Sequence, residues 1–363
     1  MPLPSSGAIS LSQANTELGR SSSATITLNE TAVRGLFGRA SGSIALSHGR
    51  GKSSGFFATI STSQKELNLR TWALANGWNG SSPATITINS GVYIWSDNTA
   101  VAGLTTGSFP GGLTIINNGF IIGKGGRGGH VNAMDTVTNC SINPGGPALS
   151  LDANCTITNN SYIAGGGGGG GSQRQLASTG VIAIFGGGGG GAGGGQGGSG
   201  WSSTANGLVH GPLGGAIGAV GLAGGGATFT GASGGRVLPG TGGAGANGLS
   251  SSAAAGGGAG GGGKTGQGGG QHPNCGGGPL LRTSSGGGGG GWGAAGGMAY
   301  GSMQCGGVNG PTGGAGGAAN AAGANGVGGN MFGAAGGTGG KAVNLNGYSV
   351  TWSATGTRYG AIS

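Results

Sequence analysis

The stretch NCTITNNSYIAGGGGGGGSQRQ, residues 154–175, places seven consecutive glycines at 165–171, directly after an alternating, strand-like pattern. Residues 165–340 hold 77 of the 103 glycines in this 363-residue chain, because 23 precede Gly165 and 3 follow Gly340. Each glycine held in regular structure costs roughly 0.5–1 kcal/mol relative to alanine. An ordered region of this composition must therefore make use of the missing side chain.

Three structures are compatible with long glycine runs in general. A flexible linker is disfavoured here, because apolar inserts such as residues 176–185 and 207–223 interrupt the runs. Collagen requires glycine at every third position only, which uninterrupted runs exclude. Polyglycine II helices have three residues per turn and outward N–H and C=O groups, so glycine strands can pack closely and bond laterally. We therefore expect a polyglycine II helix bundle, a sandwich, with the inserts as loops at its two ends.

The segments on either side of this region predict β-structure. Residues 55–122 predict a neck with one helix, which starts after an N-cap at Ser63 and ends at Gly77. Strands are expected at 84–88, 91–96 and 112–122. The Asn-rich turns at 89–91 and 117–119 are typical of β-hairpins. Residues 342–363 have a related pattern and predict a C-terminal β-hairpin that packs back on the neck. The fold class is thus mainly β and irregular.

The N-terminal segment, residues 1–54, contains a repeat. SGAISLSQ (6–13), SATITLNE (23–30) and SGSIALSH (41–48) share the pattern Ser-x-x-Ile-x-Leu. The alternation predicts short strands, the first two followed by short helices; Asn29 is a plausible N-cap for the second helix and Gly38 its stop. Such small units cannot build an independent core, so we expect another subunit or protein to cover them. The candidate attachment residues are Ile9, Leu11, Ile26, Leu28, Ile44 and Leu46.

The charged residues argue against an enzyme. The chain has only six acidic residues, and none follows Asp152. General acid–base chemistry and hard-metal sites need carboxylates or histidines, and the glycine-rich region offers only His210 and His272. We predict no catalytic residue, no cofactor and no metal. A net charge of +9 spread over 363 residues suits an anionic surface and is too dilute for nucleic acid.

The cysteines, the N-terminal residues and the apolar stretches add three further expectations. The four cysteines have no C-x-x-C spacing, and free thiols are expected, although the pairs Cys140/Cys155 and Cys275/Cys305 stay open. The start, MPLPSSGAISLSQ, lacks the pattern of a secretory signal, and no apolar stretch is long enough to predict a membrane span.

Informative side chains in the glycine-rich region are expected to lie on loops. Trp, Tyr and Arg are the usual anchors of binding interfaces, and a rigid scaffold with exposed loops is typical of a recognition module. Either end of the bundle could carry the binding loops. The candidate receptor-binding residues are Arg174, Trp201, His210, Arg236, His272, Arg282, Trp292, Tyr300 and Met303.

Several segments resemble proteins of tailed bacteriophages. The stretch LPSSGAISLSQANTELGRSSSATITLNETAVRGLFGRASGSIALSHGRGKS, residues 3–53, resembles an N-terminal segment of phage tail and tail-fibre proteins. KELNLRTWALANGWNG, TITINSGVYIWS and NNGFIIGKGGRGG resemble the neck of phage glycine-rich tail proteins. The polyglycine region is similar to the tail-fibre-tip adhesins of T4-like phages. That resemblance implies a polyglycine II sandwich whose distal loops bind host outer-membrane proteins.

The sequence therefore predicts a phage receptor-binding protein on the distal tail or tail fibre, made and assembled in the host cytoplasm. Residues 1–54 would attach to phage tail or fibre proteins, residues 55–122 form the neck, and residues 123–341 bind an outer-membrane protein or lipopolysaccharide. A structural tail-tip or fibre protein without receptor contact is the main alternative; an ice-binding protein and a depolymerase are weaker ones. Receptor, host, copy number, and the choice between monomer and homotrimer stay open.

Overall fold

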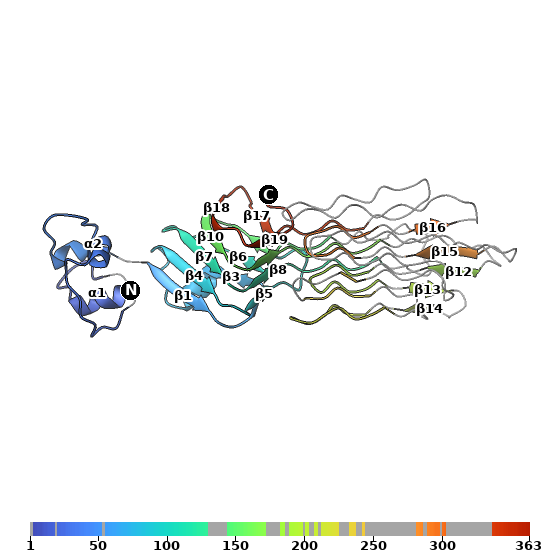
Figure 1. The fold of residues 1–363 in the computed structure, drawn as a ribbon, viewed down its shortest axis with the longest axis horizontal. Helices are drawn as coiled ribbons and strands as arrows, with labels where there is room; N and C mark the ends of the chain where they lie inside the picture. The colour runs from blue at the N-terminus through green and yellow to red at the C-terminus, as the bar shows by residue number, and fades with distance from the viewer. Residues whose placement is uncertain are drawn as a thin grey trace.

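The computed structural model describes most of the chain and shows three parts along one long axis (Figure 1). A helical N-terminal unit is followed by a β-structured middle, and the glycine-rich segments extend from the other end of that middle part. The structure is mainly β, with three α-helices among the described residues. The described residues are 3–18, 20–52, 55–129, 144–171, 182–185, 189–198, 200–202, 207–209, 212–224, 232–236, 242–243, 281–285, 289–297, 300–302 and 336–363.

Residues 3–52 fold into a small unit with an apolar cluster of its own. Its elements are α1 (Leu11–Glu17), α2 (Thr31–Phe37) and the 3-10 helix η1 (Leu46–Gly49). The buried members of the cluster are Leu3, Ile9, Ala14, Val33, Leu36 and Phe37. The prediction of short strands is wrong, because the described part of this unit contains none. The expectation that the repeats lack a core without a partner is also wrong, because they pack on one another.

One recurring hydrogen bond explains why the repeats begin helices. In each repeat the residue after the Ile donates its N–H to the side chain three positions on. Ser10 donates to Gln13 Oε1 (2.8 Å), Thr27 to Glu30 Oε1 (3.0 Å) and Ala45 to His48 Nδ1 (3.2 Å). This is half of a capping box, which Ser10 completes by accepting from the Gln13 N–H. The Ile-x-Leu alternation thus marks a helix start and not a strand.

The middle of the molecule is a parallel β-helix. The chain visits three sheets in turn, and within each sheet every strand pairs in parallel with the strand of the next coil. The first sheet contains β1 (Phe56–Ile60), β4 (Ala84–Ile88), β7 (Leu113–Asn117), β10 (Cys155–Asn159) and β18 (Val350–Ala354). The second contains β2 (Gln64–Lys65), β5 (Tyr93–Trp95), β8 (Phe120–Ile122), β11 (Tyr162–Ala164) and β19 (Thr357–Tyr359). The third contains β3 (Leu67–Asn68), β6 (Leu104–Thr105), β9 (Leu149–Ser150) and β17 (Val343–Asn344).

The interior of the β-helix is a stack of aliphatic side chains. The register aligns Ile86 with Ile115, and Ile115 with Ile157, and all three are fully buried. Cys155 lies at the edge of the same core as a free thiol, and burial raises its pKa to about 11. On the second sheet, the rings of Tyr93 and Phe120 stack at 4.5 Å between centroids. Each coil therefore repeats the side-chain layers of the coil before it.

The predicted hairpins are wrong, including the C-terminal one. Strands β7 and β8 lie in different sheets, as do β18 and β19, so the Asn-rich turns are corners of the β-helix. The asparagines bond to the next coil instead of closing a hairpin. Asn117 Nδ2 donates to Asn159 Oδ1 (2.8 Å), and Asn159 Nδ2 donates to the Thr355 carbonyl (2.8 Å). This ladder accounts for the pattern Thr-Ile-x-Asn-Asn that residues 114–118 and 156–160 share.

The neck helix is shorter than expected. Helix α3 (Leu69–Ala75) begins after its N-cap Asn68, whose Oδ1 accepts from the Thr71 N–H (3.0 Å). Residues Gln64–Lys65 pair instead with Ile94–Trp95, and Glu66 turns the chain with a φ of 52°. The residues predicted to form the first turns of the helix thus pair as strands of the β-helix instead.

The glycine-rich segments leave and re-enter the β-helix at one corner. One excursion begins at Gly123 after β8 and returns before β9; the other begins at Gly165 after β11 and returns before β17. In the preceding coil the same corner is the short loop of residues 96–103, between β5 and β6. Figure 1 shows the described segments running side by side along the long axis. The β-helix therefore sets the starting position and direction of the glycine strands.

Segment 165–171 is surrounded by other segments. Its backbone hydrogen-bonds to six neighbouring stretches, 123–129, 144–146, 189–192, 289–291, 293–297 and 336–340, and Gly165 also donates to the Tyr359 carbonyl of β19. The bonds to the first recur every third residue, since Gly123, Gly126 and Gly129 donate to Ala164, Gly167 and Gly170. A Cβ atom at Gly165, Gly166, Gly167, Gly168 or Gly169 would overlap a neighbouring carbonyl oxygen. Glycine is thus required by close approach of neighbouring backbone at the first five positions of the run.

Candidate functional site

A small mixed sheet lies at the end of the molecule away from the β-helix (Figure 1). Its strand order is β14 (Gly207–Val209), β13 (Gly200–Ser202), β12 (Ile182–Phe185), β15 (Leu281–Ser285) and β16 (Tyr300–Ser302). Three predicted receptor-binding residues lie on it: Trp201 pairs with Phe185, Arg282 with Ala183, and Tyr300 with Ser285. The fold therefore brings together candidates that are far apart in the sequence. We call this sheet the far sheet.

Four other predicted receptor-binding residues lie outside the described part of the chain. These are Arg174, His210, His272 and Met303.

Trp292 corrects the sequence-based prediction. It is fully buried against Ile122, Ala164 and Ala192, where the glycine-rich segments join the β-helix. The next residue, Gly293, donates its N–H to the Gly165 carbonyl (2.6 Å). Trp292 therefore anchors a turn of the glycine-rich region on the β-helix, and its side chain is not available to a receptor.

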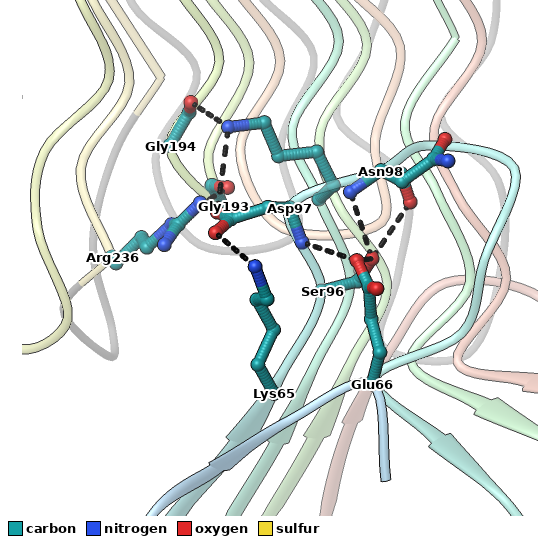
Figure 2. A network of polar contacts seen from close by, with 9 residues as sticks. Lys65, Glu66, Ser96, Asp97, Asn98, Gly193, Gly194 and Arg236 are labelled. Carbon is teal, nitrogen blue, oxygen red and sulfur yellow. Dashed lines mark hydrogen bonds and ion pairs between the residues drawn. The ribbon is translucent and has the colours of Figure 1, made fainter. Parts of the chain in front are cut away.

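Arg236 is the second correction, because it also lies at the β-helix end. Its side chain is only 8% exposed, and its guanidinium donates to the Asp97 carboxylate and, through Nε, to the Gly193 carbonyl (3.2 Å; Figure 2). Because this guanidinium is buried and paired within the chain, we assign it a structural role. The sequence could not show this, since loops at both ends of the bundle look alike in composition.

Asp97 is the centre of a charged network that the sequence did not reveal (Figure 2). Lys65 Nζ lies 3.7 Å and Lys124 Nζ 4.0 Å from its carboxylate oxygens. Burial alone would raise the pKa of Asp97, but the hydrogen bond and charge of Arg236, with the two lysines, outweigh burial and hold it below its usual 3.8. Glu66 accepts from the Asp97 N–H (3.1 Å) and the Ser96 hydroxyl (3.1 Å) and so fixes the loop that carries Asp97.

Beside this network is a hollow of about 660 Å³, which we call the junction hollow. Lys124 and Arg127 from segment 123–129, Arg236, and Asp97 supply its charged lining. Gln196 and Leu213 line it as well, and Leu213 is 71% exposed. The Lys124 ammonium donates to the Gly194 carbonyl (2.8 Å). The hollow is thus walled by basic side chains and glycine backbone.

The predicted attachment residues of the N-terminal unit differ in burial and fall into three groups. Ile9 is buried in the unit's own cluster, which contradicts its assignment to a contact surface. Leu11 is 36% exposed at the start of α1. The half-buried remainder, packed against the cluster, are Ile26, Leu28, Ile44 and Leu46.

The described residues contain neither a metal-binding cluster nor a membrane-spanning helix. They contain no group of three or more His, Cys, Asp or Glu side chains placed to hold a metal ion. No helix in that part of the chain has the length and apolar character needed to cross a membrane.

Comparison with known proteins gives a family and one solved structure. A family model described as phage tail fibre adhesin Gp38 matches residues 56–254, more than half of the chain. A crystal structure of the gp37-gp38 adhesin tip complex of the bacteriophage S16 long tail fibre is similar at 19% identity and a TM-score of 0.48. The match covers 92% of each chain. No curated protein matches this chain.

Proposed function

The chain belongs to the phage tail fibre adhesin Gp38 family, and we propose that it attaches the virion to the host surface through the far sheet and adjoining loops. The observation that carries the proposal is the position of Trp201, Arg282 and Tyr300 on one sheet at the far end of the molecule (Figure 1). Aromatic and Arg residues gathered in one place are typical of binding hot spots.

We propose that the glycine-rich segments are polyglycine II helices. The support is the hydrogen-bond spacing, because donation at every third residue to one neighbour is what a helix of three residues per turn produces. Bonding of segment 165–171 to six other described segments fits hexagonal packing. Such a scaffold satisfies the backbone groups that glycine strands would otherwise bury unpaired.

A scaffold bonded in this way suits reversible attachment. Loops held on a rigid frame lose little conformational freedom on binding, so weak contacts suffice for useful affinity. Several copies on one virion would add avidity. The partners we propose on the host side are an outer-membrane protein or lipopolysaccharide.

We propose that the N-terminal unit attaches to another tail fibre protein, as expected for an adhesin carried on a fibre. Leu11, Ile26, Leu28, Ile44 and Leu46 supply apolar surface that the unit's own core covers only in part. The family model is that of a tail fibre adhesin, which supports a fibre protein as the partner. Whether several copies assemble, for example as a homotrimer, is part of the same question.

The experiment is adsorption of a phage that carries this chain, measured with and without excess purified full-length protein. We expect the protein to slow adsorption, because it occupies the host site. A folded protein that leaves adsorption unchanged at saturating concentration contradicts direct host contact. It favours instead a structural role in the fibre or tail tip.

A further inference from the structure

We propose that the junction hollow binds a phosphorylated sugar of the host's surface polysaccharide. The proposal rests on the proposed host-attachment function for the source of the sugar, but the site itself is separate from the far sheet. Figure 2 shows the charged groups at its edge, where the β-helix corner meets the glycine-rich segments.

The charge of the lining selects the ligand. Lys124, Arg127 and Arg236 face the hollow with one carboxylate, Asp97, among its described lining residues. Lys65 and Glu66 contact Asp97 from outside the lining, and their opposite charges cancel. Two positive charges are therefore unbalanced. A phosphate monoester carries about −1.5 to −2 charges at neutral pH and matches that excess better than a single carboxylate does.

Arg127 gives independent support. Its Nε is buried and has no hydrogen-bond partner in the described part of the chain. A buried donor without an acceptor costs stability, and an acceptor oxygen of a ligand in the hollow would relieve that cost. Arg127 follows Lys124 by three residues, and the segment donates to its neighbour with the same spacing, so both side chains reach the same hollow.

Lys124 is also left short of negative charge. Its ammonium has one carbonyl partner and a distant carboxylate at 4.0 Å. Burial, and next the charge of Arg236, lower its pKa, and Asp97 offsets this only in part. To hold the β-helix against the glycine-rich segments, Asp97 would need only one of the three cations in the lining. The other two cations are not needed for that role.

The size and walls of the hollow favour a sugar over a bare ion. A volume of about 660 Å³ is in the range of small-molecule pockets and far exceeds what one phosphate fills. Gly125, Gly194 and Gly214 also line the hollow and have no side chains that would fill it. The exposed Leu213 offers an apolar wall for the C–H face of a ring.

The test is calorimetric titration of the full-length protein with a delipidated, phosphorylated lipopolysaccharide core oligosaccharide. The same oligosaccharide after removal of its phosphates, a carboxylated analogue, and inorganic phosphate serve as comparison ligands. We expect the phosphorylated form to bind at least about tenfold more tightly than each of the three. Equal binding of the phosphorylated and dephosphorylated forms, or of inorganic phosphate, overturns the proposal.

Variants locate the site. Arg127→Gln should weaken binding about tenfold or more, while Arg39→Gln, an exposed residue of the N-terminal unit, removes the same charge and should change nothing. Leu213→Glu adds a negative charge at an exposed wall and should weaken binding more than Leu213→Gln, even if Arg127→Gln proves unstable. Equal effects of the Arg127 and Arg39 variants contradict the site. If the wild-type protein does not bind the phosphorylated oligosaccharide but still competes for adsorption, only this inference is overturned. Its failure is therefore distinguishable from failure of the proposed attachment function.

Discussion

At the scale of single residues, Gly165 to Gly169 are positions that leave no room for a side chain. Gly168 approaches the Gly337 carbonyl so closely that a methyl group has no room. Gly337 cannot simply move aside, because its N–H donates to the Gly169 carbonyl (2.7 Å). Glycine here is thus a packing requirement and not a source of flexibility.

Gly168→Ala should therefore destabilise the protein by roughly 1–3 kcal/mol or more, the usual cost of overpacking a close-packed interior. Calorimetric unfolding of the full-length protein measures this. Gly35→Ala is the matched control: no atom lies within 4 Å of the added methyl group, and alanine is favoured at this exposed position of helix α2. A Gly168→Ala protein as stable as wild type would show that the segment is not packed as described.

The Asp97 network predicts a dependence of stability on pH. The pKa of Asp97 is lower in the folded protein than its usual 3.8, so the folded state binds this proton less readily than the unfolded state. The contribution is complete above pH 3.8 and is lost as the pH falls through the lower, folded value. The side chain is 45% exposed, so we expect a contribution of only about 1 kcal/mol.

Thermal unfolding of wild type and Asp97→Asn over a range of pH measures that contribution. The variant should be less stable at neutral pH, and the two curves should converge as the solution becomes more acidic than pH 3.8. A constant difference at all pH values would mean that the charge of Asp97 contributes nothing and that only its shape matters.

At the scale of structural elements, the asparagine ladder is the device that joins successive corners of the β-helix. Asn159 is 1% exposed and bonds both to Asn117 and to the Thr355 carbonyl. Asn160, next to it, bonds to Asn118 (2.8 Å) on the exposed side of the same corner. Asn159 and Asn160 thus make the same type of hydrogen bond, Asn159 in the interior and Asn160 at the surface.

Asn159→Ala should cost about 1–3 kcal/mol, because it leaves buried polar groups of the neighbouring coils unpaired. Asn160→Ala should change stability by less than about 0.5 kcal/mol, since water replaces the lost partner. Denaturant unfolding of both variants provides the comparison. Equal losses would indicate that burial of the ladder is unimportant.

Several elements could be predicted from the sequence, and others could not. The short helices near the first two repeats and the stop of α2 at Gly38, which has a φ of 66°, were predictable from the sequence. The predicted N-cap Asn29 was wrong, because α2 begins after Glu30, which makes no side-chain cap bond. The β-helix was not, because an Asn-Asn corner and a hairpin turn share the same local residues. What separates them is pairing between coils, such as Asn117 with Asn159, and one sequence does not display that pairing.

At the scale of the whole molecule, the β-helix and the glycine-rich region form one structure. The second excursion starts from β11 and returns to β17, so the β-helix holds both ends of the glycine-rich region. Trp292 and Arg236 lie at this junction although their sequence context suggested binding loops. Deciding which end a residue occupies requires knowing the direction of every glycine segment. The direction of each segment depends on the whole fold and not on the local sequence. The candidate site could therefore be predicted only in part.

The central claim is that host contact lies at the far sheet, and adsorption competition with variant protein tests it most directly. A full-length Trp201→Ala/Arg282→Gln variant that folds like wild type should compete for adsorption at least about tenfold less well. Tyr348→Ala, at a 42% exposed residue near the C-terminus, should compete as wild type does. If the far-sheet variant competes as strongly as wild type, host contact lies elsewhere and the account is contradicted.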